Sequence, residues 1–428
     1  MVPVCITRIL HFTPCSRRYD ARTPGATRPP ERRPLRTVIL AALALCSVVL
    51  VVLPHAVIRP FAAQDPAQLQ VALAVVRWAP SLSIAVLLAA LPLAVAVWRG
   101  ARPVWPRRVA VAFAMLPLAA APLLTRFNVY ERVFFHSIRT PGFIAASAAH
   151  LDARDMVLAV RSGALSRAYP VRAMTFHHIV NDVLGGAPIA VTYCSLCHTG
   201  AVWSRVVGGR TLTLHIGGIN NQNMLMRDDE TGTFWQQSTG LAVAGPLAGS
   251  SLRRVHSDEL SFALWRDESP RGEVLAPVAA DTAEYAPANW EEHMGQRASV
   301  VAPVGPFAAR DLVFGITAGG ADRAYLASSV RSSRVVLDHV GAVPVALLVA
   351  TDGQSVRAFE AHAAGGDVEL FADPQRPSTW IDATGAVWGF DGCTQPAGRC
   401  LQPLPVMRSY WFDWRGRHPS TSVWTPPR

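Results

Sequence analysis

The chain has 428 residues, a formal net charge of +10 and a hydrophobic content of 50%, which is more apolar than a soluble protein requires. The apolar excess lies almost wholly before residue 130, so it says little about the rest of the chain. All basic side chains are arginine, and many of them precede residue 37, while arginine mixes with Asp and Glu after residue 130. Without a basic stripe or a recognisable binding module, this composition argues against a nucleic-acid partner.

Three apolar runs predict membrane-spanning helices at residues 37–54, 78–98 and 109–125. The first run is long enough to cross a bilayer core of roughly 30 Å. Arginines concentrate in residues 1–36 and between the second and third runs, whereas the loop after the first run carries Arg59 before the next hydrophobic stretch. The positive-inside rule therefore predicts an Arg-rich cytoplasmic flank over residues 1–36 and a membrane anchor over 37–126.

Three crossings would place the rest of the chain outside the cytoplasm. We therefore expect a multi-pass protein of a bacterial inner membrane, with its C-terminal domain in the periplasm or outside the cell. A cleaved signal peptide is the alternative for the first run, although no small-residue cleavage site follows it cleanly.

The outer segment aligns with itself at an offset of 156 residues. The triplet RAY at 167–169 recurs at 323–325, Asp182 recurs as Asp338, and FALWR at 262–266 resembles WFDWR at 411–415. Each copy is typical of short strands followed by a helix-like stretch and a buried strand. We expect an α+β, strand-rich domain of two tandem related units, 130–290 and 300–428, with approximate twofold symmetry, while chance similarity is the alternative.

A Cys-x-x-Cys motif directly follows the apolar strand PIAVTY in the first unit. His198 comes next in the chain, and His177 lies on a helix-like segment that must pack near the strand. Thiolates and imidazoles at this spacing suit copper or zinc, and Met224 and Met226 offer thioethers that Cu(I) accepts. The predicted metal ligands are Cys194, Cys197, His177 and His198. Residues predicted to orient these ligands or to line a pocket are His178, Asn181, Tyr193, Asn221, Asn223, Asp228, Trp235 and Gln237.

Some of these residues also suit purely structural roles. Asn221, Asn223 and Asp228 are common turn formers, and Trp235 at a strand start is typical of a core residue.

Two other functions compete with metal binding at the Cys-x-x-Cys motif. The same two cysteines support thiol-disulfide exchange, or they form a rigid disulfide in a non-catalytic envelope binding or scaffold domain. A cysteine-nucleophile hydrolase is disfavoured because nothing local marks an oxyanion hole. The second unit has Ala350 and Gly353 at the matching positions, which indicates that one unit carries the chemistry. Whether the domain is an enzyme stays open, and the expected partners are the lipid bilayer and a metal ion or a thiol protein.

A second cysteine pair, Cys393 and Cys400, brackets the loop CTQPAGRC. Outside the cytoplasm, a structural disulfide that closes this loop is the expected state of the pair.

The run RAYPVRAMTFHHIVNDVLGGAPIAVTYCSLCHTGAVW, followed by NNQNMLMRDDETGTFWQQSTGLAVAGPLAG, resembles the bacterial family named domain of unknown function 3179. The resemblance covers roughly residues 155–420, downstream of the three-helix anchor. The positions that match the family motifs are His177, Asn181, Asp182, Tyr193, Cys194, Cys197, Asn221, Asn223, Asp228, Trp235, Gln237, Thr239 and Gly240. The family usually has glutamate and glycine where His178 and His198 stand here. The resemblance implies the extent of the domain and the identity of its motifs, and it implies no activity.

Overall fold

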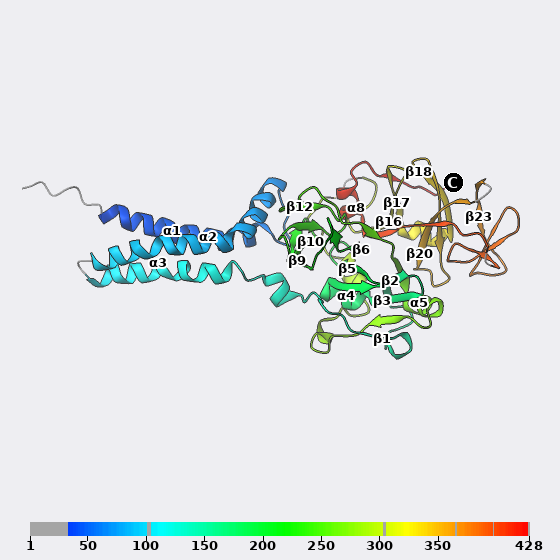
Figure 1. The fold of residues 1–428 in the computed structure, drawn as a ribbon. Helices are drawn as coiled ribbons and strands as arrows, with labels where there is room; N and C mark the ends of the chain where they lie inside the picture. Colours follow the sequence, from blue (N-terminus) through cyan, green and yellow to red (C-terminus); the bar gives the residue numbers. More distant parts are fainter. Residues whose placement is uncertain (1–32, 101–103, 303–304, 364–365, 397, 427–428) are drawn as a thin grey trace, which may run out of the picture.

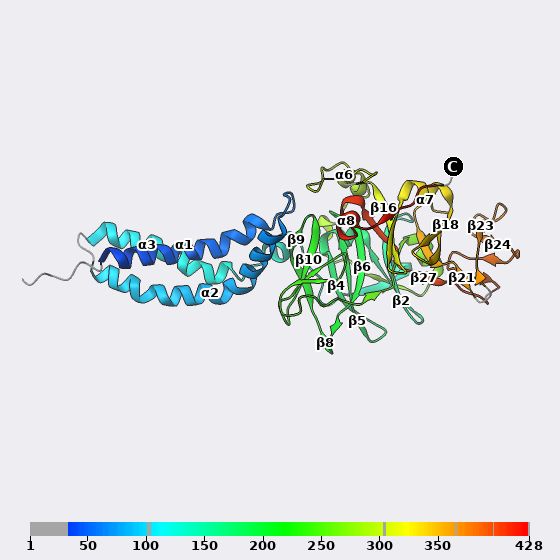
Figure 2. The same cartoon turned by 90° about the horizontal axis from the view of Figure 1, so that it is seen from above.

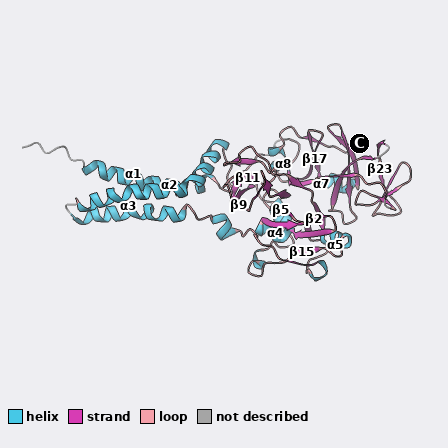
Figure 3. Cartoon of the chain, in the orientation of Figure 1, coloured by secondary structure: helices cyan, strands magenta, loops and turns pink. Residues whose placement is uncertain are grey.

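The computed structural model describes residues 33–100, 104–302, 305–363, 366–396 and 398–426. Most of the predicted cytoplasmic flank therefore lies outside the described residues. Three long helices form one end of the molecule and a strand-rich domain forms the other (Figure 1). The same division appears in the turned view of Figure 2 and in the colouring of Figure 3, where helix dominates the first part and strand the second.

The anchor consists of α1 (Arg33–Val57), α2 (Pro66–Arg99) and α3 (Val104–Leu124). All three helices are long and apolar enough to cross a membrane, which confirms three apolar helices at the predicted places. Helix α2 begins at Pro66 and not near residue 78, because Asp65 caps it by accepting hydrogen bonds from the backbone amides of Ala67 and Gln68. The prediction had followed only the charge-free run after Arg77.

The added turns of α2 fasten the anchor to the domain. Leu69 and Leu73 of α2 pack with Ile58 against Ile219 and Phe234 of the domain in one buried apolar cluster. Burial of this apolar surface stabilises the joint between helices and sheet.

Before residue 300, the domain contains three main sheets with strand orders β1-β15-β3-β2-β14, β13-β6-β5-β4 and β12-β11-β10-β9. The first sheet comprises β1 (Phe143–Ala145), β2 (Met156–Ser162), β3 (Leu165–Pro170), β14 (Asp258–Ser261) and β15 (Glu273–Leu275). The second comprises β4 (Ile179–Leu184), β5 (Ala187–Cys194), β6 (Thr199–Ser204) and β13 (Arg254–Val255). The third comprises β9 (Leu214–Asn220), β10 (Asn223–Asp228), β11 (Phe234–Gln236) and β12 (Ala242–Ala244).

After residue 300, three further four-stranded sheets have the orders β28-β16-β17-β29, β18-β19-β20-β27 and β23-β24-β25-β26. The first comprises β16 (Leu312–Ala318), β17 (Ala321–Leu326), β28 (Met407–Tyr410) and β29 (Ser422–Val423). The second comprises β18 (Val335–Val340), β19 (Val343–Val349), β20 (Val356–Glu360) and β27 (Gln402–Leu404). The third comprises β23 (Leu370–Ala372), β24 (Trp380–Asp382), β25 (Val387–Trp388) and β26 (Thr394–Gln395).

Short helices and two small hairpins complete the domain. The α-helices are α4 (Val171–His177), α5 (Phe262–Glu268), α6 (Trp290–Gly295), α7 (Ala327–Ser333) and α8 (Trp411–Arg417). The π-helix η1 (Tyr130–Phe134) and the 3₁₀ helices η2 (Ala146–Ala148) and η3 (Thr282–Glu284) are single turns. The hairpins are β7 (Val206–Val207) with β8 (Arg210–Thr211) and β21 (His362–Ala363) with β22 (Gly366–Asp367).

Strand β5 separates two apolar clusters because its side chains alternate between its faces. Val191 and Tyr193 pack on one face in a cluster with Met174 of α4. Ala190 and Cys194 point to the other face, into a second cluster. The pleat therefore decides which helices and loops can reach the cysteines.

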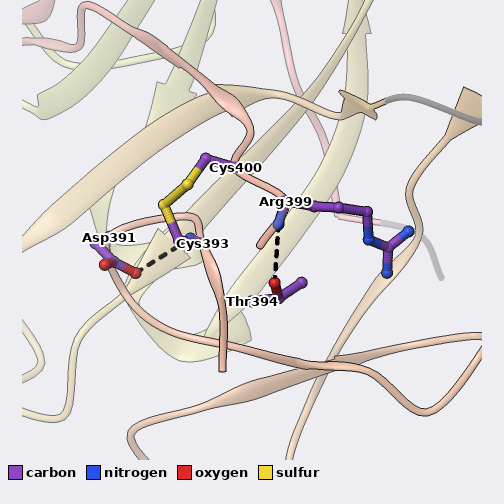
Figure 4. Close-up of a disulfide and its surroundings, with 5 residues drawn as sticks. All are labelled: Asp391, Cys393, Thr394, Arg399 and Cys400. Atoms are coloured by element: carbon purple, nitrogen blue, oxygen red, sulfur yellow. Dashed lines mark hydrogen bonds between the residues drawn. A yellow bond between two sulfur atoms is a disulfide. The ribbon is translucent and has the colours of Figure 1, made fainter. Parts of the chain in front are cut away.

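The Cys393–Cys400 disulfide is present (Figure 4), as the sequence predicted. The amide of Cys393 donates to Asp391 Oδ1 at 3.1 Å, and the amide of Arg399 donates to Thr394 Oγ1 at 3.0 Å. These bonds hold the two ends of the closed loop.

Candidate functional site

Cys194 and Cys197 form a close pair of free thiols in a buried turn. Cys194 ends β5, Cys197 lies in the turn before β6, and both side chains are buried. The pair approaches to near 2.8 Å, which is longer than the roughly 2.05 Å of a disulfide bond. Burial and the neighbouring Cys194 raise the pKa of the Cys197 thiol well above its usual value. Cys197 is therefore protonated at neutral pH in this arrangement.

A buried amide links the sulfur of Cys197 to a buried carboxyl group. The side-chain amide of Asn223, at the start of β10, lies 3.0 Å from Cys197 Sγ and 3.2 Å from Asp413 Oδ2 of α8. Burial raises the pKa of Asp413. The amide donor favours negative charge on the sulfur, while the carboxyl group can accept a proton nearby.

Further polar side chains from distant segments complete this network. Thr199 Oγ1 lies 3.1 Å from Ser409 Oγ and 3.4 Å from Asp413 Oδ2. Gln237 donates to Thr192 Oγ1 and to the carbonyl of Thr199, both at 3.0 Å. A buried polar network of this kind is costly unless it is satisfied, so its presence around two thiols makes this region the candidate functional site.

The tip of the β9–β10 hairpin covers the thiols. Cys194 Sγ donates to the backbone carbonyl of Gln222 at 3.5 Å. Asn221 and Gln222 form the two-residue turn, with φ of 47° and 67°. Asparagine tolerates such angles, but they are strained for glutamine, and strained residues gather at functional sites. Hydrogen bonds from neighbouring segments stabilise this turn.

The anchor supplies one of those neighbours. The amide of Asn221 donates to Gln64 Oε1 at 2.6 Å, and the amide of Gln64 donates to Asn221 Oδ1 at 2.9 Å. Gln64 Nε2 also donates to the carbonyl of Ile219 at 3.1 Å. The loop between α1 and α2 therefore clamps the segment that covers the thiols.

The structure does not bring His177 to the cysteines. Its Nδ1 lies 2.7 Å from the carbonyl of His136 and its Nε2 lies 3.0 Å from the Tyr285 hydroxyl. Burial lowers the pKa of His177. The helix α4 does pack beside β5, as predicted, but against the strand face opposite to Cys194.

His198 also faces away from the sulfurs. Its ring stacks on Trp290 at 5.2 Å, its Nδ1 lies 3.1 Å from the Tyr193 hydroxyl, and its Nε2 lies 3.4 Å from the Glu291 carboxylate. In the described part of the chain, no group of three or more His, Cys, Asp and Glu side chains could hold a metal ion. The predicted four-ligand set is thus not assembled.

His178 and Tyr193 brace the strand that ends at Cys194. His178 Nδ1 lies 2.7 Å from the carbonyl of Tyr193, and the amide of Tyr193 donates to the carbonyl of His178 at 2.9 Å. Burial lowers the pKa of His178 to about 4. The imidazole is neutral at neutral pH, as a buried ring without a charge partner should be.

Three other predicted pocket residues have structural contacts. Asn181 joins β4 to β9 through two bonds of 2.8 Å with the backbone of Leu214. Asp228 accepts the indole N–H of Trp235 at 2.8 Å and orders the turn after β10. Of the predicted polar residues, Asn223, Gln237 and Asn221 therefore belong to the thiol site or its cover.

The sequence reasoning missed Asp413, Ser409 and Gln64. A signal for Asp413 existed, because WFDWR places an aspartate where the related FALWR has Leu264. A carboxylate in place of a partly buried leucine requires a partner when the position is buried. No comparable signal pointed to Gln64, whose role depends on the contact between anchor and domain.

A family model described as protein of unknown function (DUF3179) matches residues 135–421. The chain belongs to the DUF3179 family. The match begins about twenty residues before the resemblance seen in the sequence, so the DUF3179 region includes the segment at Ile138, whose backbone pairs with Ile179 and Asn181 of β4. No curated protein and no solved structure matches the chain significantly.

Proposed function

We propose that this DUF3179 protein is a membrane-anchored thiol-disulfide oxidoreductase that uses Cys194 and Cys197. The observation that carries the proposal is a close pair of free, buried thiols. Next to them lie an amide that can donate a hydrogen bond to sulfur and a carboxyl group that can accept a proton. Thiol-disulfide exchange requires both sulfurs, and it requires no bound metal or cofactor.

The reaction balances as two successive exchanges with an external disulfide. Cys194 loses its thiol proton to the solvent, and its thiolate attacks one sulfur of the substrate disulfide, forms a mixed disulfide and releases the first thiolate, which takes up a proton from the solvent. Cys197 passes its proton to the ionised Asp413 carboxylate and attacks the Cys194 sulfur. This step releases the second thiolate, to which Asp413 returns the proton. The substrate gains two electrons and two protons overall, while Cys194 and Cys197 become a disulfide. The reverse sequence oxidises a substrate dithiol.

Asn223 is the residue that connects these steps. Its amide touches the sulfur that must lose a proton and the carboxyl oxygen that accepts it. Hydrogen bonding to a developing thiolate lowers the cost of forming it. Access by a substrate requires the Asn221–Gln222 turn to move, since both sulfurs are buried beneath it.

The proposed location is the outer face of a bacterial inner membrane. Three candidate membrane helices support the anchoring, and the Cys393–Cys400 disulfide is typical of a compartment outside the cytoplasm. A protease added to intact spheroplasts should digest the domain, whereas a domain that faces the cytoplasm would be protected.

We also propose that the domain consists of two tandem units with approximate twofold symmetry. Strands β16 and β17, helix α7 and strands β18 and β19 each start 156 residues after β2, β3, α4, β4 and β5. His178 and Arg334, 156 residues apart, have φ of 57° and 59°. The ion pair between Arg167 and Asp182 has a counterpart between Arg323 and Asp338. These likenesses support one reactive unit and one supporting unit.

The test uses the full-length protein in lipid nanodiscs, with Cys5, Cys15 and Cys46 replaced by serine. Equilibration with graded ratios of reduced and oxidised glutathione, followed by alkylation and mass measurement, should reveal one two-electron couple. The protein should also reduce insulin. Cys194→Ser or Cys197→Ser should abolish both results, while the background protein without Cys5, Cys15 and Cys46 should keep them. A pair that stays oxidised under all ratios would favour the scaffold function instead.

A soft metal held by the two thiolates is the second candidate. Met224 and Met226 lie in the same buried cluster as Cys194 and Cys197, and thiolates with thioethers suit Cu(I). Titration of the reduced protein with Cu(I) and Zn(II) tests this function. Unchanged affinity in a Cys194→Ser, Cys197→Ser double variant would exclude it.

A further inference from the structure

A cavity of about 270 Å³ lies at the joint between anchor and domain. Its walls come from the domain-facing ends of α1, α2 and α3 and from the β9–β10 sheet. Figures 1 and 2 both show this sheet next to the ends of the helices. If the three helices cross a bilayer, the cavity lies at the level of the lipid headgroups on the domain side.

The cavity combines positive charge with apolar walls. The described residues that line it include three basic side chains, His55, Arg126 and Arg227, and no acidic one. Leu50 and Leu124 belong to the apolar part of the lining. Charged groups with one sign in a partly apolar site are unfavourable without a counter-ion.

Arg227 is the clearest sign of a missing counter-ion. Its guanidinium stacks on Phe234 at 5.2 Å, and among the described residues it has no hydrogen-bond acceptor or ion-pair partner. The side chain is partly buried, and burial lowers its pKa. The cross-strand pairing of Arg227 with Phe234 directs both side chains to the face that packs on the anchor.

We propose that this cavity binds the phosphate group of an anionic phospholipid. Arg126 and Arg227 would hold the phosphate, and the acyl chains would leave along the apolar surfaces of the helices. Basic pockets beside membrane helices bind such headgroups. A free phosphate ion would pair with the arginines equally well, but it would leave the apolar walls of the cavity without a contact. We therefore infer that the ligand is the lipid.

The experiment uses the full-length protein in detergent and native mass spectrometry with two lipids that have identical acyl chains. Phosphatidylglycerol should bind more tightly than phosphatidylcholine. The double variant Arg126→Gln, Arg227→Gln should bind phosphatidylglycerol about thirtyfold more weakly, because each lost cation removes one charge contact near the headgroup. The matched control is Arg99→Gln, Arg107→Gln at the opposite end of the anchor, which should bind as the wild type does.

Three results would overturn the proposal. They are unchanged binding in the Arg126, Arg227 double variant, an equal loss in the control pair, and displacement of phosphatidylglycerol by the same concentration of inorganic phosphate. A photoactivatable phosphatidylglycerol tests the site without a mutation. Its label on the wild-type protein should fall on residues 50–58 or 124–130, and a label confined to other segments would contradict the proposal.

Discussion

Asn223 shows how single side chains determine the chemistry at the thiol pair. One amide nitrogen lies within hydrogen-bond distance of both the Cys197 sulfur and the Asp413 carboxyl group. The carboxyl group influences the sulfur through its charge as well, because ionised Asp413 opposes ionisation of Cys197. Burial raises the pKa of both groups, so the negative charge of either one opposes ionisation of the other.

Asp413→Asn should lower the pKa of the Cys197 thiol. The substitution removes the negative charge that opposes the thiolate, while the asparagine oxygen still accepts the bond from Asn223. The pH profile of alkylation of the Cys194→Ser variant measures this pKa and should move to lower pH. The same change at the remote Asp373 should leave the profile in place, and an upward shift in Asp413→Asn would contradict the assigned role.

His178 should make the domain less stable in mild acid. Its pKa is about 4 in the folded state and about 6.5 in an unfolded chain. The unfolded state therefore takes up a proton first as the pH falls from 6.5 to 4, and the free energy of unfolding should drop by about 3 kcal/mol over that interval. Denaturant titrations at several pH values measure the loss.

His178→Asn is the variant that isolates this contribution, because asparagine tolerates the positive φ at this position. Its stability should depend less on pH than that of the wild type. His362→Asn, at an exposed histidine, is the matched control and should retain the full dependence. Identical curves for the wild type and His178→Asn would refute the assignment.

At the scale of elements, the β9–β10 hairpin acts as a cover that the anchor holds. Gln64, in the loop between α1 and α2, bonds to Asn221 at the hairpin tip, while Gln222 of the same tip contacts Cys194. The anchor thus influences the thiols through two hydrogen-bonded residues.

Gln64→Ala should expose Cys194 to reagents. Loss of the bonds to Asn221 and Ile219 loosens the turn, so maleimide should react with Cys194 faster in Gln64→Ala than in the protein with Gln64. Both proteins lack Cys5, Cys15 and Cys46 in this experiment. Gln70→Ala offers a close comparison, since Gln70 also joins the anchor to the domain by donating to the carbonyl of Val243 at 3.1 Å. Equal rates for all three proteins would show that the clamp does not control access.

Much of the fold could be predicted from sequence because it follows from patterns along the chain. Apolar runs indicated the three helices, and the strand PIAVTY indicated the turn that carries the cysteines. The place of His177 could not be predicted in this way, since it depends on which face of β5 helix α4 covers. Asp413 and Ser409 come from a segment about two hundred residues away, so only the three-dimensional fold brings them to Cys197.

At the scale of the whole molecule, a buried ion-pair group joins the parts of the chain before and after residue 300. Arg357 of β20 contacts Asp258 of β14 at 2.8 Å and Glu268 of α5 at 2.8 Å. The Arg357 side chain is 6% exposed. Its guanidinium lies 4.7 Å from the ring centroid of Phe390, which belongs to a large apolar cluster with residues from both parts of the chain.

Arg357→Met should lower the free energy of unfolding by about 3 kcal/mol, because it removes the most buried cation from two carboxylates at the joint, while Arg161 still pairs with Glu268 and His256 still lies 3.4 Å from Asp258. Chemical denaturation followed by tryptophan fluorescence measures the change. Arg376→Met breaks a pair with Asp373 in which the arginine is exposed and should cost less than about 1 kcal/mol. A small effect of Arg357→Met would mean that apolar packing alone holds the joint.

Helix α2 spans 34 residues, with Pro80 and Pro92 inside it, a length of about 50 Å, whereas a bilayer core needs only about 30 Å. Its surplus turns at the N-terminal end pack against the β9–β10 sheet. If the helices cross a bilayer as proposed, this contact would keep the cysteine turn close to the lipid surface. Molecules that travel within the membrane plane, or that are tethered close to it, would then meet the thiols more often than molecules that diffuse through the surrounding fluid.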